Sequence, residues 1–400
     1  MLNSHDASSG LTGRSGLRWR TQDVASCLPP SARLPLLAAR AAHPAARSGD
    51  HKALARTLLE LGRLEDAWHA LAPALAASAD SGTHLLAGII SRQCGRIDQA
   101  AGHLRAVLAD EPASVPAIIG LARCLEQRPS PEDALSALED GLCRVPGNRE
   151  LWAALTDVAV RRRDVAFLTR ALADLPPPDR YIACIDDARI FLARQAGDAT
   201  TLERMLQAPA LVAEIDLVDA DDPLLAAVLA EVAQVSDFVA NPYDKSTTGG
   251  RQAAFAVTRD RPAWSSLCER IHDHVELYLH TLASTDPPFP FPLPAQEVAL
   301  RSWTVRLGSG GRQRAHLHPT GWLTGVVYLA VPPEIMDSGD GAGCLEIPLL
   351  PGGAIPGWPV RRIRPGKGKL VLFPPYMRHA TVPFHSEQER VCIAFDLLAA

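Results

Sequence analysis

Two histidines separated by a single residue, His316 and His318, are the positions where this sequence points most directly to chemistry. Alternate residues of an extended strand lie on the same side, so both imidazoles would face one way, as two ligands of one metal ion do. A third histidine, His379, follows the segment "GKLVLFPPYMR", and Arg390 comes eleven residues later. These four side chains predict a metal site with a guanidinium nearby that can hold an anionic ligand.

Short apolar runs separated by turns carry these residues: "EVALRSWTVRL", "GVVYLAV", "CLEIPLL", "KLVLF" and "RVCIAFDLL". Several of them alternate polar and apolar residues with period two, as half-buried strands do. In the last run Arg390, Cys392, Ala394 and Asp396 share one face, where the small residues beside the arginine leave room for a ligand. The glycine-rich segment 308–313 fits a hairpin turn. We expect an all-β barrel or sandwich.

The first half of the chain is rich in helix-forming residues and has an internal period. The segments "LGRLEDA", "CGRIDQA" and "RPSPEDA" end at Ala67, Ala100 and Ala134, in steps of 33 and 34 residues. This pattern resembles the tetratricopeptide repeat, a helix pair that stacks on its neighbours into a solenoid. Three units are clear over roughly 50–148, and a fourth is degenerate, with Leu168 at the alanine position.

The repeats have three possible roles that the sequence does not separate. A concave groove could hold a peptide segment of a protein substrate or partner, the outer surface could form a dimer, or the repeats could serve as a rigid spacer. The oligomeric state stays open for the same reason.

Composition divides the chain near residues 236–245, since 16 of its 33 prolines lie between Pro287 and Pro383. Prolines at that density break helices and suit short strands. We therefore expect a partly disordered leader over 1–47, a repeat domain over 48–235 and a β domain over 236–400.

Charge and cysteine usage exclude several classes of partner. The formal net charge is -5, with acidic and basic residues interspersed, so neither a nucleic acid nor an anionic membrane surface is expected as a partner. Eight scattered cysteines without a CxxC pair argue against a disulfide framework or a thiolate zinc site. No eighteen apolar residues follow one another, so no membrane span is expected, and the cytoplasm is the simplest location.

The segments "HLHPTGWLTGVVYL", "GKLVLFPPYMRHATVPF" and "ERVCIAFD" together resemble the 2-oxoglutarate and iron(II)-dependent oxygenase superfamily, in particular its bacterial members with N-terminal tetratricopeptide repeats. The resemblance implies a double-stranded β-helix (jelly roll) behind an α-solenoid. It also implies that His316, His318 and His379 bind Fe(II) and that Arg390 holds the far carboxylate of 2-oxoglutarate. Turnover with dioxygen would yield succinate, carbon dioxide and a hydroxylated product.

Two further side chains could belong to such a site. Tyr328 lies at strand spacing from the ligands and could hydrogen-bond the cosubstrate, although core packing fits it equally well. Trp322 could wall the substrate pocket or pack at the rim of the barrel.

One residue departs from the common pattern of this superfamily, which has two histidines and one carboxylate in the order HxD or HxE. The second position here is His318. A three-histidine triad is the first interpretation. Otherwise Glu346 or Asp396 supplies a carboxylate, or only two histidines bind tightly. Three neutral imidazoles would leave the metal complex with one more positive charge than the usual triad.

The leading functional prediction is a dioxygenase that hydroxylates a protein or peptide side chain presented by the repeats. One alternative is a scaffold protein whose barrel has lost catalysis. Another is a cupin-like thiol dioxygenase, because those enzymes also use three histidines but need no cosubstrate.

Overall fold

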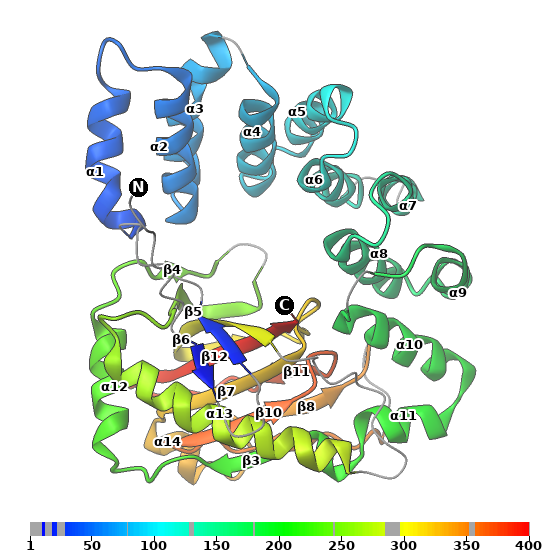
Figure 1. Cartoon of the computed structure of the whole chain (residues 1–400), viewed down its shortest axis with the longest axis vertical. Helices are drawn as coiled ribbons and strands as arrows, with labels where there is room; N and C mark the ends of the chain where they lie inside the picture. The colour runs from blue at the N-terminus through cyan, green and yellow to red at the C-terminus, as the bar shows by residue number, and fades with distance from the viewer. Residues whose placement is uncertain are drawn as a thin grey trace, which may run out of the picture. The chain divides into compact units, whose positions relative to one another are not determined.

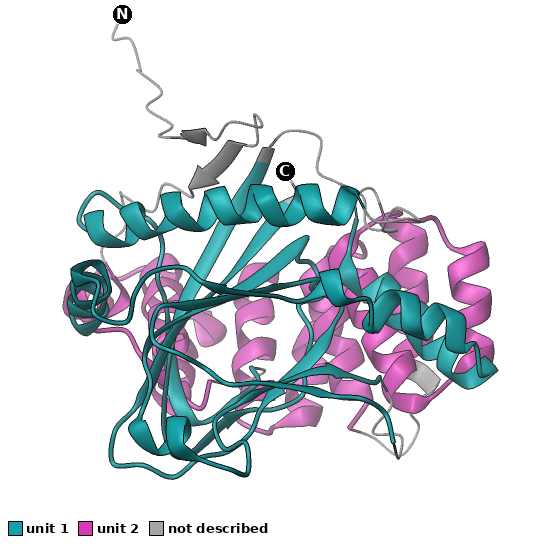
Figure 2. Ribbon diagram, turned by 90° about the horizontal axis from the view of Figure 1, so that it is seen from below, with its two compact units in different colours: residues 1–27, 180–235, 244–400 teal, residues 28–179, 236–243 magenta. Residues whose placement is uncertain are grey.

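The computed structural model describes residues 29–77, 79–127, 132–178, 181–242, 245–284, 297–351 and 357–399, and the backbones of two short strands, β1 (Gly10–Thr12) and β2 (Arg18–Thr21). Residues 1–9, 13–17 and 22–28 of the expected leader, 1–47, lie outside the described residues, as does the proline-rich segment 285–296. Contacts divide the chain into two compact units. Unit 1 comprises 1–27, 180–235 and 244–400, and unit 2 comprises 28–179 and 236–243 (Figure 2).

Unit 2 is a succession of helices in which each helix packs mainly against its neighbours in the sequence, as Figure 1 shows. The helices are α1 (Pro30–Ala41), α2 (Ser48–Glu60), α3 (Leu64–Ala77), α4 (Ser81–Gln93), α5 (Ile97–Asp110), α6 (Val115–Leu125), α7 (Glu132–Arg144), α8 (Arg149–Arg162) and α9 (Val165–Asp174). The α-solenoid expected from the repeats is confirmed.

The repeated alanines have a packing reason. Ala67, Ala100 and Ala134, near the starts of α3, α5 and α7, are all fully buried. A small side chain at this position lets the neighbouring helix approach closely, and this explains the spacing of the repeat. Leu168 of α9, at the corresponding position of the degenerate unit, is also fully buried. The last unit therefore buries the same position with a larger side chain.

Unit 1 is built on two arrays of strands, which are antiparallel except where β2 pairs with β6 in parallel. Its strands are β3 (Ala213–Asp216), β5 (Thr247–Ala254), β6 (Glu297–Gln313), β7 (Leu323–Ala330), β8 (Leu345–Leu349), β9 (Arg361–Ile363), β10 (Lys369–Phe373), β11 (Arg378–Thr381) and β12 (Arg390–Ala399). The larger sheet has the order β1-β2-β6-β12-β7-β10-β3, with β5 on β6, and the smaller sheet has the order β11-β8-β9. The expected double-stranded β-helix is confirmed, and each of the five apolar runs forms a strand.

In its described residues, unit 1 also has the α-helices α10 (Ala183–Ala196), α11 (Ala199–Leu206), α12 (Pro223–Ala233), α13 (Pro262–Ala283) and α14 (Pro333–Asp337). The long helix α13 turns an apolar stripe inward, with Trp264, Leu267, Ile271 and Val275 buried at the three- and four-residue spacing of a helix face. None of the helices in the described ranges is both long and apolar enough to cross a bilayer.

Residues 181–235, whose composition places them with the repeats, contact the barrel. Asp187 of α10 accepts two hydrogen bonds of 2.7 Å from the guanidinium of Arg378 on β11. The hydroxyl of Tyr376 donates to the carbonyl of Met205, and β3 pairs with β10. These contacts join segments more than 150 residues apart in the sequence. The helix-forming composition of residues 180–235 is a local property, so it does not indicate whether these residues pack with the repeats or with the barrel.

The glycine-rich segment 308–313 was expected to form a hairpin turn, but it continues β6 to Gln313. Its glycines instead permit two backbones to touch. A Cβ atom on Gly311 would lie 2.6 Å from the carbonyl oxygen of Gly249 on the paired strand β5, and Gly310 has a φ of 72°. This is the geometry of an irregular strand pair, in which glycine marks a close approach of two backbones.

A second close approach leads to a prediction about stability. Gly325 of β7 lies against Phe395 of β12, and an added Cβ atom would be 2.2 Å from Cζ of that ring. We expect Gly325→Ala to destabilise unit 1 by about 1–3 kcal/mol in urea unfolding, because the buried ring has no room to move. Gly308→Ala is the control, since its Cβ would meet nothing within 4 Å. Equal unfolding midpoints for the two variants would contradict the prediction.

Candidate metal centre

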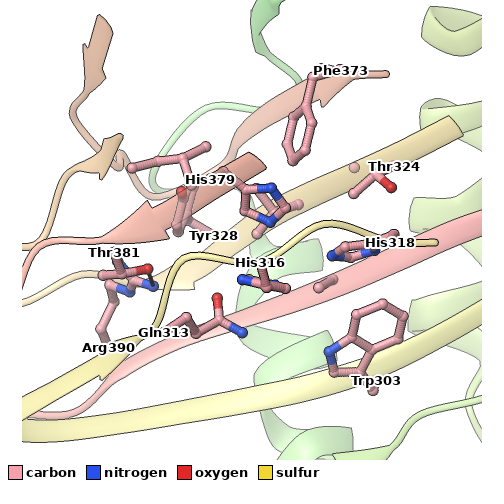
Figure 3. Close-up of a pocket in the computed structure, with 14 residues that line it drawn as sticks. Trp303, Gln313, His316, His318, Thr324, Tyr328, Phe373, His379, Thr381 and Arg390 are labelled. Carbon is pink, nitrogen blue, oxygen red and sulfur yellow. Dashed lines mark hydrogen bonds between the residues drawn. The ribbon is translucent and has the colours of Figure 1, made fainter. Parts of the chain in front are cut away.

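Three histidines converge in unit 1. Potential ligand atoms of His316, His318 and His379 all lie within 4.8 Å of one another, and the ring centres are 4.3 to 5.3 Å apart. Figure 3 shows the three imidazoles directed into one pocket. His316 and His318 lie in the segment between β6 and β7, whereas His379 is on β11.

The backbone holds these two segments together. The amide of His316 donates to the carbonyl of His379 at 3.0 Å, and the amide of His379 donates back to the carbonyl of His316 at 2.9 Å. The amide of His318 donates to the carbonyl of Pro375. Main-chain atoms make these bonds, so the imidazole side chains are not needed to hold the two segments together.

Each imidazole uses its Nδ1 atom for a hydrogen bond to oxygen. Nδ1 of His316 is 2.8 Å from the carbonyl of Arg314, and Nδ1 of His379 is 2.9 Å from the carbonyl of Met377. Nδ1 of His318 contacts the carboxylate of Asp396. A carbonyl oxygen can only accept, so Nδ1 carries the proton in the first two rings and Nε2 keeps a lone pair.

Burial keeps two of these imidazoles neutral. Burial and the neighbouring His318 lower the pKa of His316 to about 3. Burial also lowers the pKa of His379 well below its usual value, assisted by the two other histidines. Both rings are therefore uncharged at neutral pH, which is the form that binds a metal ion.

Neither carboxylate considered as an alternative ligand joins this group. Asp396 contacts the far nitrogen of His318, accepts a hydrogen bond of 2.7 Å from Arg301, and accepts one of 2.9 Å from Thr324. Burial would raise the pKa of Asp396, but His318 and Arg301 outweigh it and the pKa is lowered. Glu346 is paired with Arg362 at 3.0 Å. Among the described residues, the cluster with metal-ligand geometry consists of the three histidines.

Arg390 lies in the same pocket and is buried, with 2% of its surface exposed. One terminal nitrogen donates to the carbonyl of Gly343 at 2.7 Å, and the other donates to the hydroxyl of Thr381 at 3.3 Å. Its buried Nε has no hydrogen-bond partner among the described residues. A buried cation with an unsatisfied donor is costly, so this guanidinium is suited to an anionic ligand.

The pocket encloses about 370 Å³ of space between its lining residues, part of which is open to solvent. All five residues expected at the site line it, including Tyr328, whose ring centre is 5.5 Å from the guanidinium carbon of Arg390. Trp303 and Gln313 also line it and were not foreseen.

Strand register explains why the pocket has an unforeseen tryptophan. Ala394 of β12 pairs with Trp303 of β6 and with Val326 of β7, so these residues share the pocket face. Alternation had placed Ala394 on that face, but the neighbouring strands and their register cannot be read from one strand.

Trp322 is buried and lies outside the set of residues that line the pocket, so its packing interpretation holds.

Comparisons with known proteins agree with the domain types. Residues 301–396 match the family described as "Putative 2OG-Fe(II) oxygenase", and residues 93–158 match the tetratricopeptide repeat. The first range includes all three histidines, Arg390 and Tyr328. The resemblance drawn from the sequence is confirmed: an oxygenase-family domain follows tetratricopeptide repeats.

Solved structures similar to parts of the chain have low sequence identity. A Pseudomonas putida prolyl-4-hydroxylase is 16% identical, with a TM-score of 0.35, and the match covers 48% of this chain and 93% of that one. HygX from Streptomyces hygroscopicus, solved with nickel and 2-oxoglutarate, is 12% identical, with a TM-score of 0.34 and coverages of 51% and 87%. MamA from Desulfovibrio magneticus is 19% identical, with a TM-score of 0.33 and coverages of 36% and 82%. No curated protein matches the chain.

Proposed function

We propose that this chain, with its 2OG-Fe(II) oxygenase domain and tetratricopeptide repeats, is an active iron(II)- and 2-oxoglutarate-dependent dioxygenase that hydroxylates a protein or peptide side chain. The observation that carries the proposal is that three imidazoles meet, in one pocket, a buried guanidinium whose Nε has no hydrogen-bond partner in the part of the chain that the structure describes. Neither feature alone would define the reaction class.

The three histidines suit the metal. His316, His318 and His379 would hold Fe(II) through their Nε2 atoms, because their Nδ1 atoms are engaged with oxygen. Three ligands from the protein would leave other coordination positions of the ion for 2-oxoglutarate and dioxygen. When bound, iron and 2-oxoglutarate would supply the oxidative decarboxylation that activates dioxygen for attack on a C–H bond.

Arg390 suits the cosubstrate. It would donate two parallel hydrogen bonds to the far carboxylate of 2-oxoglutarate, an arrangement that a planar guanidinium makes better than any other side chain. Its two present bonds, to Gly343 and Thr381, fix the plane of the guanidinium before the ligand arrives. Tyr328 packs beside the guanidinium, and we propose that its hydroxyl also binds the cosubstrate.

The repeats support a protein or peptide as the substrate class. Stacked helical repeats present an extended surface that suits a peptide segment better than a small metabolite. A partner protein or a second copy of the chain could occupy the same surface, so the substrate class needs its own experiment.

The test is an assay of the full chain with Fe(II), 2-oxoglutarate and dioxygen. We expect slow succinate formation without substrate and faster formation when a proteome extract is added. Mass spectrometry of that extract should find peptides that have gained one oxygen atom only when 2-oxoglutarate is present.

Other outcomes would identify the alternatives. Oxygen consumption with a thiol substrate and no 2-oxoglutarate would indicate a thiol dioxygenase. A chain that binds neither iron nor 2-oxoglutarate would be a scaffold. Succinate formation with hydroxylation of a small molecule alone would retain the oxygenase and reject the peptide substrate.

A further inference from the structure

Asp396 is a buried carboxylate in direct contact with one of the three histidines. Its side chain is 1% exposed and lies on β12, the strand that also carries Arg390. One carboxylate oxygen accepts hydrogen bonds from Nδ1 of His318 and from the hydroxyl of Thr324, and the other accepts from Arg301. Both oxygens are therefore held in place, and the carboxylate has one orientation.

His318 differs from the other two histidines in this contact. The Nδ1 atoms of His316 and His379 face main-chain carbonyls, which carry only partial charge. His318 alone has a carboxylate there, and it occupies the position where the common triad of these oxygenases has a carboxylate ligand. Position 318 therefore carries no negative charge itself. The negative charge is instead on Asp396, one hydrogen bond farther from the place that a metal ion would occupy.

We propose that Asp396 is a positioning residue that holds the proton of His318 on Nδ1, orients Nε2 toward the metal and returns negative charge to a three-histidine site. The inference rests on the proposed iron site. A carboxylate behind a ligating imidazole makes the ring a stronger donor, as such outer partners do in other metal sites. Arg301 offsets part of this charge, but its side chain is 48% exposed and water screens it more than it screens the buried carboxylate.

The pairing also predicts what a carboxylate at position 318 would do. His318→Asp would restore the HxD pattern, yet the new carboxylate would face Asp396 in a buried space without the imidazole between them. Like charges that close disfavour one another, so this variant should bind metal poorly. The double variant His318→Asp/Asp396→Asn should bind more tightly than His318→Asp, because an amide can donate to the new carboxylate.

The experiment is an anaerobic titration of the metal-free full chain with Fe(II), and with Co(II) as a stable substitute. We expect Asp396→Asn to weaken metal binding about 10- to 100-fold, the usual effect of removing an outer-shell partner. Glu346→Gln is the matched control: the same change at a carboxylate that pairs with Arg362 should leave the affinity unaltered. Urea unfolding of the metal-free variants separates loss of fold from loss of affinity.

A second measurement needs no variant. In ¹H–¹⁵N spectra of the metal-free wild-type chain, the ring proton of His318 should reside on Nδ1, shifted downfield by the carboxylate. A proton on Nε2 would overturn the inference. So would an Asp396→Asn variant that binds metal as tightly as wild type, or a double variant that binds no better than His318→Asp. A wild-type chain that binds no metal at all would instead overturn the proposed function, and this inference with it.

Discussion

His379→Ala is expected to abolish iron binding and succinate formation. The site has three candidate ligands from protein side chains, and losing one of them should cost more than the roughly 100-fold upper end seen for outer-shell partners. Turnover should fall to background, because iron would no longer be retained at assay concentrations. The measurement is anaerobic Fe(II) titration, followed by a succinate assay of the same samples.

The variant should still fold. The bonds that join His316 to His379 are made by main-chain atoms, so alanine can keep them. His385→Ala is the matched control: this exposed histidine lies six residues farther along, and its loss should change neither iron binding nor turnover. Wild-type iron affinity in His379→Ala would remove this residue from the metal site.

Arg390→Lys should raise the dissociation constant for 2-oxoglutarate while leaving iron binding intact. Lysine retains the charge but not the planar pair of donors. Its ammonium group cannot keep the bonds to Gly343 and Thr381 and also make two parallel hydrogen bonds to the ligand. Loss of one charge-assisted hydrogen bond costs about 1.5–3 kcal/mol, which corresponds to about 10- to 100-fold in affinity. Anaerobic titration of the iron-loaded chain with 2-oxoglutarate gives this constant.

The control for Arg390 is Arg362→Lys, the same substitution at an arginine that pairs with Glu346 and does not line the pocket. It should bind 2-oxoglutarate like the wild type. If Arg390→Lys binds with unchanged affinity as well, the cosubstrate carboxylate has another partner and the role proposed for Arg390 is wrong. If both variants lose iron, the barrel itself has been disturbed.

Local patterns were sufficient for the architecture. Three of the repeats bury a small residue at the same position, so Ala67, Ala100 and Ala134 marked the solenoid. Strand alternation depends only on the period of the backbone, so five apolar runs predicted five strands. The spacing of His316 and His318 predicted two imidazoles facing one pocket, and both line it, although they lie between β6 and β7 and not on a strand. The domain boundary expected at residue 235 remains a prediction. Residues 180–235 fall in the same compact unit as the barrel.

Contacts between segments distant in the sequence determine which groups the side chains of the pocket meet. His379 meets His316 through a pair of backbone bonds. The register of β12 on β7 sets Asp396 opposite Thr324, and His318, in the segment before β7, contacts the same carboxylate. A carboxylate on the pocket face could have been a ligand or a ligand's partner, and local spacing is the same in both cases. Only the packing of strands from separate parts of the chain determines which histidine nitrogen the carboxylate of Asp396 contacts. The same packing determines whether the buried guanidinium of Arg390 keeps an N–H group available for a ligand.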